Sequence, residues 1–433
     1  MSGGKAHGDV DLETLQRQSF SYFLNETNPD NGLVIDKTAA DWPASIAATG
    51  FALAAYPVAV ERGFMPRAAA LERTLTTLRF FWNSSQGPEP DATGYHGFYY
   101  HFLEMRTGRR AWQCELSTID SAFLLAGALT VGVYFDGDTD DEREIRTLAE
   151  SLYRRADWQW AQNGGATVTH GWEPQNGFLK YRWEGYDEAM LLYVLGLGAP
   201  DHPLSESCYR AWTSTYLWEH YHGYDYLYAG PLFTHQLSHL WIDFRGIQDA
   251  FMRVKGIDYF ENSRRATYVQ QQYAMDNPLK FAGYGRHCWG ITASDGPGPD
   301  TIKVSGIERQ FFGYLGRGVS YGPDDGTIAP WAAVSSLPFA PELVLPTMDY
   351  YVNHLKLTHS NPFGFKATFN PTYPGNASNP HAWVSPFHCG LNQGPIVLMI
   401  ENYRSRLLWR LMRNCPFIAS GLRRAGFGGG WLS

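Results

Sequence analysis

The sequence has few cysteines and no cluster of basic residues, and both shortages exclude functions. Its five cysteines show no C-x-x-C spacing, so neither a zinc ribbon nor a disulfide framework is predicted. With 35 Lys and Arg against 43 Asp and Glu, the formal net charge is −8. Phosphate binding needs basic residues gathered into a stripe, and none is present. A nucleic acid is therefore not an expected partner.

Long apolar runs are missing as well. No stretch approaches the roughly 18 apolar residues that mark a membrane-spanning helix. Residues 1–10 lack the apolar segment of a secretion signal. We therefore expect a soluble protein without a membrane partner, cytoplasmic unless a leader has been removed, in which case periplasmic or secreted. The sequence does not indicate an oligomeric state.

Aromatic residues, by contrast, are plentiful. Phe, Trp and Tyr make up 15% of the 433 residues, and many of them stand in stretches rich in glycine and polar residues. More than half should pack in a large core. Aromatic rings in loops can also hold a ligand that is apolar on its faces and hydroxylated at its edges. A sugar has this character, so the composition is compatible with a neutral carbohydrate ligand.

Apolar residues recur at helical spacing in twelve segments. The even-numbered segments are apolar on nearly every side, which is typical of buried helices, whereas the odd-numbered ones are amphipathic. This alternation predicts an all-α fold, an (α/α)6 barrel of six inner and six outer helices. It would form a single domain over residues 11–433, after a disordered tail at 1–10. We expect the helices near residues 11–25, 45–62, 67–83, 117–134, 141–161, 187–197, 204–218, 231–253, 258–276, 328–336, 340–355 and 393–412.

The connections between the predicted helices differ in length. Those that leave a buried helix are short, and those that enter one are long, as at residues 84–116, 162–186, 277–327 and 356–391. Long loops in a compact domain are usually functional. We therefore expect the site where these loops meet the N-termini of the inner helices, whose free N–H groups can orient hydroxyls and carboxylates.

Carboxylates stand at these positions. Cleavage of a glycosidic bond needs one acid to protonate the leaving oxygen and a second carboxylate as base or nucleophile. Glu188 begins a strongly apolar helix, so burial could raise its pKa and keep it protonated as the general acid. Asp120 and Glu115 enter another inner helix, and Asp325 is a candidate base. Each could instead have a structural role as a turn, a cap or a charge in a first helical turn.

Other polar and aromatic residues in the entry loops are candidates for contact with a sugar. For each of the aromatic ones, packing within its loop is equally compatible with the sequence. His235 and His239 stand four residues apart, but the Glu of H-E-x-x-H is absent, so packing and a hydroxyl contact are favoured over zinc. No metal or other cofactor is expected. The candidates for substrate binding are Trp42, Trp172, Trp183, Tyr186, His235, Trp289 and Asn392.

Two charged stretches are better explained by structure. Residues 256–265 begin an outer helix on the short-loop side of the ring, where a salt-bridge network is expected. Residues 138–141 match the D-x-D-D pattern of terpene cyclases, which also use helical toroids. They stand in a short exit loop before an amphipathic helix, so helix capping is the favoured interpretation. Because fold alone does not decide function, a toroidal cyclase or lyase stays an alternative.

Taken together, these segments are similar to the glucoamylase-like family that includes bacterial endo-β-1,2-glucanases, glycoside hydrolase family 144. The resemblance runs from about residue 12 to the C-terminus. It is carried, in one order, by residues 115–120 (ELSTID), 185–192 (GYDEAMLL), 238–246 (SHLWIDFRG), 256–265 (GIDYFENSRR), 289–296 (WGITASDG), 325–330 (DGTIAP) and 393–402 (QGPIVLMIEN).

The resemblance implies an (α/α)6 barrel that acts on β-1,2-glucan or its oligosaccharides, without metal, by an inverting route, with Glu188 where the acid is expected. Relatives include transglycosylating domains, so glucosyl transfer is an alternative to hydrolysis. Asn392 stands where the family is often expected to carry Asp. If that Asp were the base, the activity of this chain would be weakened, its specificity would be altered, or it would depend on another carboxylate such as Asp325. A glucan-binding protein without activity is the third alternative.

Overall fold

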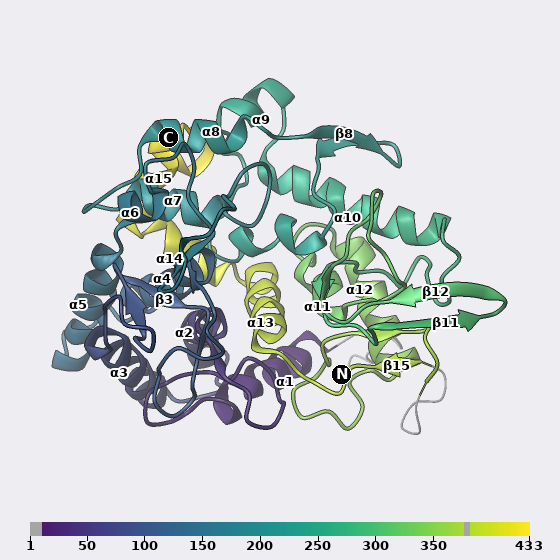
Figure 1. Ribbon diagram of the computed structural model, residues 1–433, viewed down its shortest axis with the longest axis horizontal. Helices are drawn as coiled ribbons and strands as arrows, with labels where there is room; N and C mark the ends of the chain where they lie inside the picture. Colours follow the sequence, from purple (N-terminus) through teal and green to yellow (C-terminus); the bar gives the residue numbers. More distant parts are fainter. Residues whose placement is uncertain (1–10, 376–381) are drawn as a thin grey trace, which may run out of the picture.

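Helices dominate the computed structural model, which describes residues 11–375 and 382–433 (Figure 1). The tail predicted at residues 1–10 lies outside this range. No helix within it combines the length and the apolar character that a membrane span requires. The longer helices are α1 (Leu12–Asn25), α2 (Ile46–Glu61), α3 (Arg67–Asn83), α4 (Thr118–Tyr134), α5 (Asp140–Arg155), α7 (Met190–Gly198), α8 (Glu206–Thr213), α10 (Tyr259–Asp276), α12 (Pro341–Asp349), α13 (Gly390–Arg404) and α15 (Pro416–Arg424).

Helices α2, α4 and α13 form the centre of the core. The sequences of α2 and α4 are apolar on nearly every side, and α13 is apolar in its middle, at residues 395–400. Helix α2 packs against both α4 and α13, α7 packs against α4, and the short helix α11 (Pro330–Ser335) packs against α13. Glycines allow the closest of these contacts. A Cβ on Gly127 would lie 2.2 Å from the carbonyl oxygen of Gly50, so neither position admits a side chain without moving α2 or α4.

Amphipathic helices cover this buried set. Helix α5 packs against α3 and α4, α1 packs against α13, and α12 packs against α11. The side chain of Thr139 caps α5 by accepting a hydrogen bond from the N–H of Glu142. This confirms the capping interpretation of residues 138–141. In α10, Glu261 pairs with Arg265 at 3.0 Å, and Arg264 lies 3.5 Å from Glu342, so the predicted structural salt-bridge network is confirmed.

The helix predicted at residues 231–253 is wrong. The structure has two 3₁₀ turns, η1 (Leu232–His235) and η2 (Leu237–Leu240), and then α9 (Ala250–Lys255). Gln236 interrupts the helix, since its side-chain amide donates to Ala332 O and Ser336 Oγ. Tertiary hydrogen bonds of polar side chains therefore override an apolar pattern that is typical of a helix.

Four other predicted helices differ from those in the structure, and the C-terminal helix α15 was not predicted. The segment at 141–161 divides into α5 and α6 (Trp158–Gln162), and α8 ends five residues before the predicted end. The last helix breaks at Arg406, whose φ of 61° begins a separate α14 (Leu407–Arg413). The helix predicted at 340–355 changes to a π-helical turn, η3 (Tyr350–His354).

Short strands, which the all-α prediction lacked, organise the long connections before the buried helices. One antiparallel sheet has the order β2-β3-β5-β6-β7 and brings together two entry loops. Its strands are β2 (Gly94–Tyr95), β3 (Phe98–Tyr100), β5 (Leu116–Ser117), β6 (Gly171–Glu173) and β7 (Gly177–Phe178). The other pairs are β1 (Ala44–Ser45) with β4 (Phe102–Leu103), β8 (Trp218–Tyr221) with β9 (Tyr224–Leu227), β10 (Ala293–Ser294) with β13 (Leu315–Gly316), β11 (Asp300–Val304) with β12 (Ile307–Phe311), and β14 (Phe369–Asn370) with β15 (Trp383–Val384).

Candidate active site

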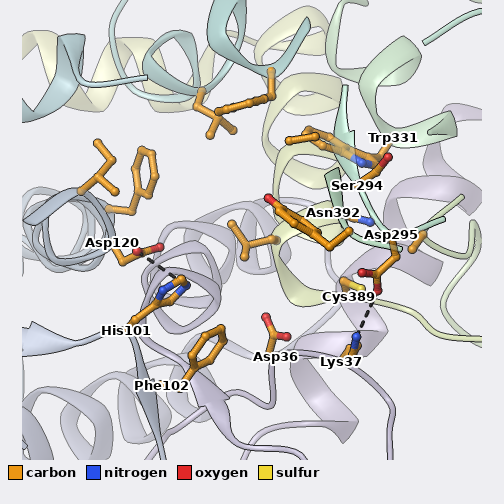
Figure 2. A pocket seen from close by; sticks show the side chains of 18 of the residues that line it. Asp36, Lys37, His101, Phe102, Asp120, Ser294, Asp295, Trp331, Cys389 and Asn392 are labelled. Carbon is orange, nitrogen blue, oxygen red and sulfur yellow. Dashed lines mark hydrogen bonds and ion pairs between the residues drawn. The ribbon is translucent and has the colours of Figure 1, made fainter. Parts of the chain in front are cut away.

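A cavity of about 470 Å³ lies where the long connections meet the N-terminal ends of buried helices (Figure 2). Asp120 belongs to the first turn of α4, Glu188 precedes α7 by two residues, and Asn392 lies in the first turn of α13. This is the end of the molecule at which the loop lengths predict the site. The residues that line the cavity include Asp36, Lys37, Trp42, His101, Phe102, Trp112, Asp120, Glu188, Asp295, Tyr314, Trp331, Cys389 and Asn392.

Glu188 and Asp120 share this cavity, as expected from the sequence. Burial raises the pKa of Glu188 to about 8, and the negative charges of Asp120 and Asp187 add to the rise, whereas His101 opposes it. A carboxyl group with this pKa carries a proton at neutral pH. The neighbouring Asp187 is held elsewhere, since it accepts hydrogen bonds from Ala189 N and Trp212 Nε1. Glu188 therefore has the protonation state that a general acid needs.

His101 connects two of the predicted carboxylates, Glu115 and Asp120. Its Nδ1 lies 2.9 Å from Glu115 Oε1, and its Nε2 lies 3.7 Å from Asp120 Oδ2. Burial alone would lower the pKa of His101, but the charges of Asp120, Glu115 and Asp36 raise it to about 9, so the ring is an imidazolium at neutral pH. Asp120 also accepts a hydrogen bond of 2.5 Å from Ser117 Oγ. Asp120, which lines the cavity, thus has one hydrogen-bond donor in Ser117 and an imidazolium at ion-pair distance.

Glu115, a candidate catalytic carboxylate, does not line the cavity. Burial would raise the pKa of Glu115, but the hydrogen bond and charge of His101 hold it below the usual range. Strand β5 aims this side chain at His101, because His101 N donates to Glu115 O in the same pairing of strands. The influence of Glu115 on the cavity therefore passes through His101.

A second polar wall consists of Asp36, Lys37 and Asp295. Lys37 Nζ lies 3.0 Å from Asp295 Oδ2 and 4.4 Å from the centre of the Trp42 ring. Trp42 Nε1 donates to Asp36 Oδ2 at 3.0 Å, and burial raises the pKa of Asp36. Trp42 also meets Trp112 edge to face, with ring centres 4.7 Å apart. Trp42, a candidate for substrate binding, therefore lines the cavity.

Asp325 is not a wall of the cavity, which corrects its prediction as a base. Both its oxygens are bound by Arg317, at 2.7 Å from Nε and 2.8 Å from Nη2. The two side chains are fully buried. Burial would raise the pKa of Asp325, but Arg317 holds it below the usual range. The carboxylate is thus committed to an internal ion pair and is not available to a substrate.

Five predicted sugar contacts pack away from the cavity. Trp172 lies against Tyr95, with ring centres 5.2 Å apart. Trp183 stacks on His170 at 3.9 Å and donates its indole N–H to Thr118 Oγ1. In each case packing within the loop accounts for the ring, because the aromatic character of an entry loop does not say which way its side chains point. The five residues are Trp172, Trp183, Tyr186, His235 and Trp289.

The other three of these five also have internal contacts. Tyr186 packs against His235, with ring centres 5.2 Å apart. His235 Nε2 lies 3.2 Å from Ala229 O, so this ring is satisfied internally. Trp289 is fully buried and donates its indole N–H to Thr347 Oγ1 at 2.9 Å. The structure therefore places these three residues in internal packing and outside the cavity.

Comparison with known proteins shows the family to which the chain belongs. The Glycoamylase family model, described as "Putative glucoamylase", matches residues 180–416, which is more than half of the chain. The chain belongs to this family. The matched segment includes several residues that line the cavity, among them Glu188, Asp295, Trp331 and Asn392.

Solved structures resemble the whole chain. The "putative glucoamylase" of Bacteroides uniformis is 32% identical, with a TM-score of 0.85 over 99% of this chain and 100% of that one. An endo-β-1,2-glucanase of Chitinophaga pinensis, in complex with sophorotriose and glucose, is 26% identical, with a TM-score of 0.82 over 97% of this chain and 98% of that one.

A curated relative is longer than this member of the Glycoamylase family. The exo β-1,2-glucooligosaccharide sophorohydrolase of Parabacteroides distasonis is 27% identical over 95% of this chain. The match spans 57% of that relative's own length.

Several cavity residues of this family member were missed by sequence reasoning. His101 meets Glu115 only because β3 pairs with β5, and nothing in the local sequence indicates that pairing. Asp295 had a usable signal, since it stands in the segment 289–296 that resembles the family. Trp289 was chosen from that segment instead. Asp36 and Lys37 stand shortly before Trp42, but two charged residues in a loop are too common to indicate a site.

Proposed function

We propose that the protein is a glycoside hydrolase that cleaves β-1,2-glucan or its short oligosaccharides. The observation that carries this proposal is the position of Glu188, a carboxyl group protonated at neutral pH, in one cavity with Asp120, Asp36 and Asp295. Relatives named for action on β-1,2-linked glucans, from Chitinophaga pinensis and Parabacteroides distasonis, support the linkage.

Glu188 is the general acid of this mechanism. Its proton moves to the glycosidic oxygen as the bond to C1 breaks, so the leaving sugar departs as a neutral hydroxyl. In the same step a carboxylate on the opposite side of the ring activates a water that attacks C1, so the anomeric configuration is inverted. The reaction needs Glu188 protonated and the other carboxylate ionised. Different surroundings of the acidic groups in one cavity allow their pKa values to differ in this way.

Aromatic side chains supply the binding surface. Trp42 and Trp112 meet at one side of the cavity and offer flat apolar surfaces to the faces of glucosyl units. Trp331 also lines the cavity, and Asn392 offers both a donor and an acceptor to a sugar hydroxyl.

The helices fit an (α/α)6 toroid in one domain, although short strands occupy its long connections. Support comes from the succession of buried helices, with α2 between α4 and α13, and α11 beyond α13. In Figure 1, α13 lies in the middle of the molecule between α2 and α11. A toroid accounts for the cavity, because it gathers the N-terminal ends of the buried helices at one end.

The test is a panel of linear gluco-oligosaccharides that differ only in linkage: β-1,2, β-1,3, β-1,4 and β-1,6. Reducing-sugar release and product mass are measured for each. We expect hydrolysis of the β-1,2 series alone, with every product shorter than its substrate. Products longer than the substrate would indicate transfer in place of hydrolysis. Binding without any product would contradict the enzymatic proposal.

A further inference from the structure

The proposed hydrolysis needs an ionised carboxylate that faces the anomeric carbon from the side opposite Glu188. Three aspartates line the cavity besides Glu188: Asp36, Asp120 and Asp295. Asn392 also lines it, but a carboxamide cannot take a proton from water. The position and partners of each aspartate decide which of them can act as a base.

Asp120 lies on the side of the acid. The negative charge of Asp120 raises the pKa of Glu188, so the two groups interact electrostatically. Its Oδ2 is also occupied, with Ser117 Oγ at 2.5 Å and His101 Nε2 at 3.7 Å. An inverting base must reach the opposite face of the sugar, with space for a water between the two carboxyl groups. Asp120 is therefore better suited to keep Glu188 protonated than to activate a water on the opposite face.

Asp36 is a poor base for a different reason. Burial raises its pKa, and the negative charge of Asp295 adds to the rise, so it holds a proton more readily than an ordinary aspartate. One of its oxygens accepts the indole N–H of Trp42. This carboxyl group is therefore better suited to position Trp42 than to draw a proton from water.

Asp295 has the required surroundings. Figure 2 shows it across the cavity from Asp120 and His101, beside Asn392 and with Lys37 below it. Lys37 Nζ lies 3.0 Å from its Oδ2 and forms an ion pair with it. About a quarter of the Asp295 side chain is exposed, so the second oxygen can be reached from the cavity.

The backbone around Asp295 is fixed by three contacts. Strand β10, which ends one residue earlier, pairs with β13. The carbonyl oxygen of Asp295 accepts a hydrogen bond from Thr368 Oγ1 at 2.8 Å, and that of Ser294 accepts one from Arg317 Nη1 at 2.6 Å. The ion pair of Arg317 with Asp325 therefore supports the segment that carries Asp295. A base held in this way keeps its geometry through the reaction.

We propose that Asp295 is the general base, with Asn392 beside it to orient the attacking water. The inference rests on the proposed hydrolysis. Asp295 accepts one proton of the water, the water oxygen bonds to C1, the bond from C1 to the glycosidic oxygen breaks, and Glu188 gives its proton to that oxygen. Asp295 ends protonated and Glu188 ionised. Proton exchange with solvent then restores both groups.

The test compares two substrates and four forms of the enzyme. One substrate is a β-1,2-gluco-oligosaccharide, and the other is its 2,4-dinitrophenyl β-glycoside, whose leaving group needs no acid. Asp295→Asn should lower kcat on both substrates by roughly 100- to 10,000-fold. Glu188→Gln should lower kcat by a similar factor on the oligosaccharide only, and by less than about tenfold on the dinitrophenyl glycoside. Wild type and Asp300→Asn, a substitution on β11 outside the cavity, should behave alike.

A second measurement separates catalysis from folding. Asp295→Ala with added azide should give a glycosyl azide of α configuration, because the small anion replaces the activated water. A merely structural role would give no such product. If wild type cleaves neither substrate, the proposed function itself is wrong and the inference falls with it. If wild type is active and Asp295→Asn stays within about threefold of it, or if Asp36→Asn abolishes activity in its place, only the base assignment is overturned.

Discussion

His101 Nδ1 lies 2.9 Å from Glu115 Oε1, so a carboxylate outside the cavity sets the charge of a ring that lines it. The imidazolium in turn faces Asp120 and opposes the raised pKa of Glu188. Burial and the negative charges of Asp120 and Asp187 keep Glu188 protonated against this opposition. The arrangement leads to predictions on pH dependence, on binding and on stability.

The activity of the wild-type enzyme should fall as pH rises through about 8. Glu188 is active when protonated, and burial together with the charges of Asp120 and Asp187 raises its pKa to about 8. Above this pH the acid loses its proton and the rate declines tenfold per unit. The measurement is kcat/KM against pH on a β-1,2-gluco-oligosaccharide. A decline that begins near pH 5 would contradict the protonated state of Glu188.

Replacement of His101 by Gln should move this basic limb to higher pH. The positive charge of His101 lowers the pKa of Glu188, so its removal lets burial and the neighbouring charges act without opposition. Glu115→Gln should shift the limb in the same direction but less, because it weakens the imidazolium without removing the ring. The same pH profile measures both variants. A shift to lower pH in His101→Gln would contradict this description.

Trp112→Ala should weaken substrate binding with little effect on the chemical step. The ring is 56% exposed and meets Trp42 at the cavity, where it offers a face to a glucosyl unit. We expect KM to rise roughly tenfold, equivalent to about 1.4 kcal/mol, with kcat within about twofold. Trp82→Ala is the matched control, because Trp82 is an exposed tryptophan on α3 outside the cavity. Equal KM values for the two variants would contradict the binding role.

Asp325→Asn should destabilise the protein because it leaves the buried Arg317 without its partner. Both side chains are fully buried, and breaking such a pair costs about 3–5 kcal/mol. Urea unfolding of the variant and the wild type gives this difference in free energy. A loss below about 1 kcal/mol would mean that the pair contributes little, and Asp325 would then need another explanation.

Much of the helical framework could be predicted from the sequence, because an apolar pattern repeated over fifteen or so residues dictates burial. The N-terminal halves of α2 and α4 are such cases. The prediction for residues 231–253 did not hold, since the side chain of Gln236 bonds to Ala332 and Ser336 in a distant segment. Non-local hydrogen bonds leave no periodic trace in a sequence.

The cavity was predicted less completely than the helices. Asp120 and Glu188 could be found because a carboxylate at the start of an apolar helix is an unusual combination. Lys37 and Asp295 could not be paired in the same way, since 258 residues separate them and each is ordinary in its own loop. Trp289 and Asp295 stand in one segment, but only the fold shows that the ring enters the core and the carboxylate enters the cavity.

The most direct test of the account is the rate of reducing-sugar release from a β-1,2-gluco-oligosaccharide by Glu188→Gln. Glu184→Gln is the matched control, four residues earlier and outside the cavity. The account predicts a loss of roughly 100- to 10,000-fold for Glu188→Gln and a rate within about twofold of wild type for Glu184→Gln. Unchanged turnover by a folded Glu188→Gln variant would contradict it.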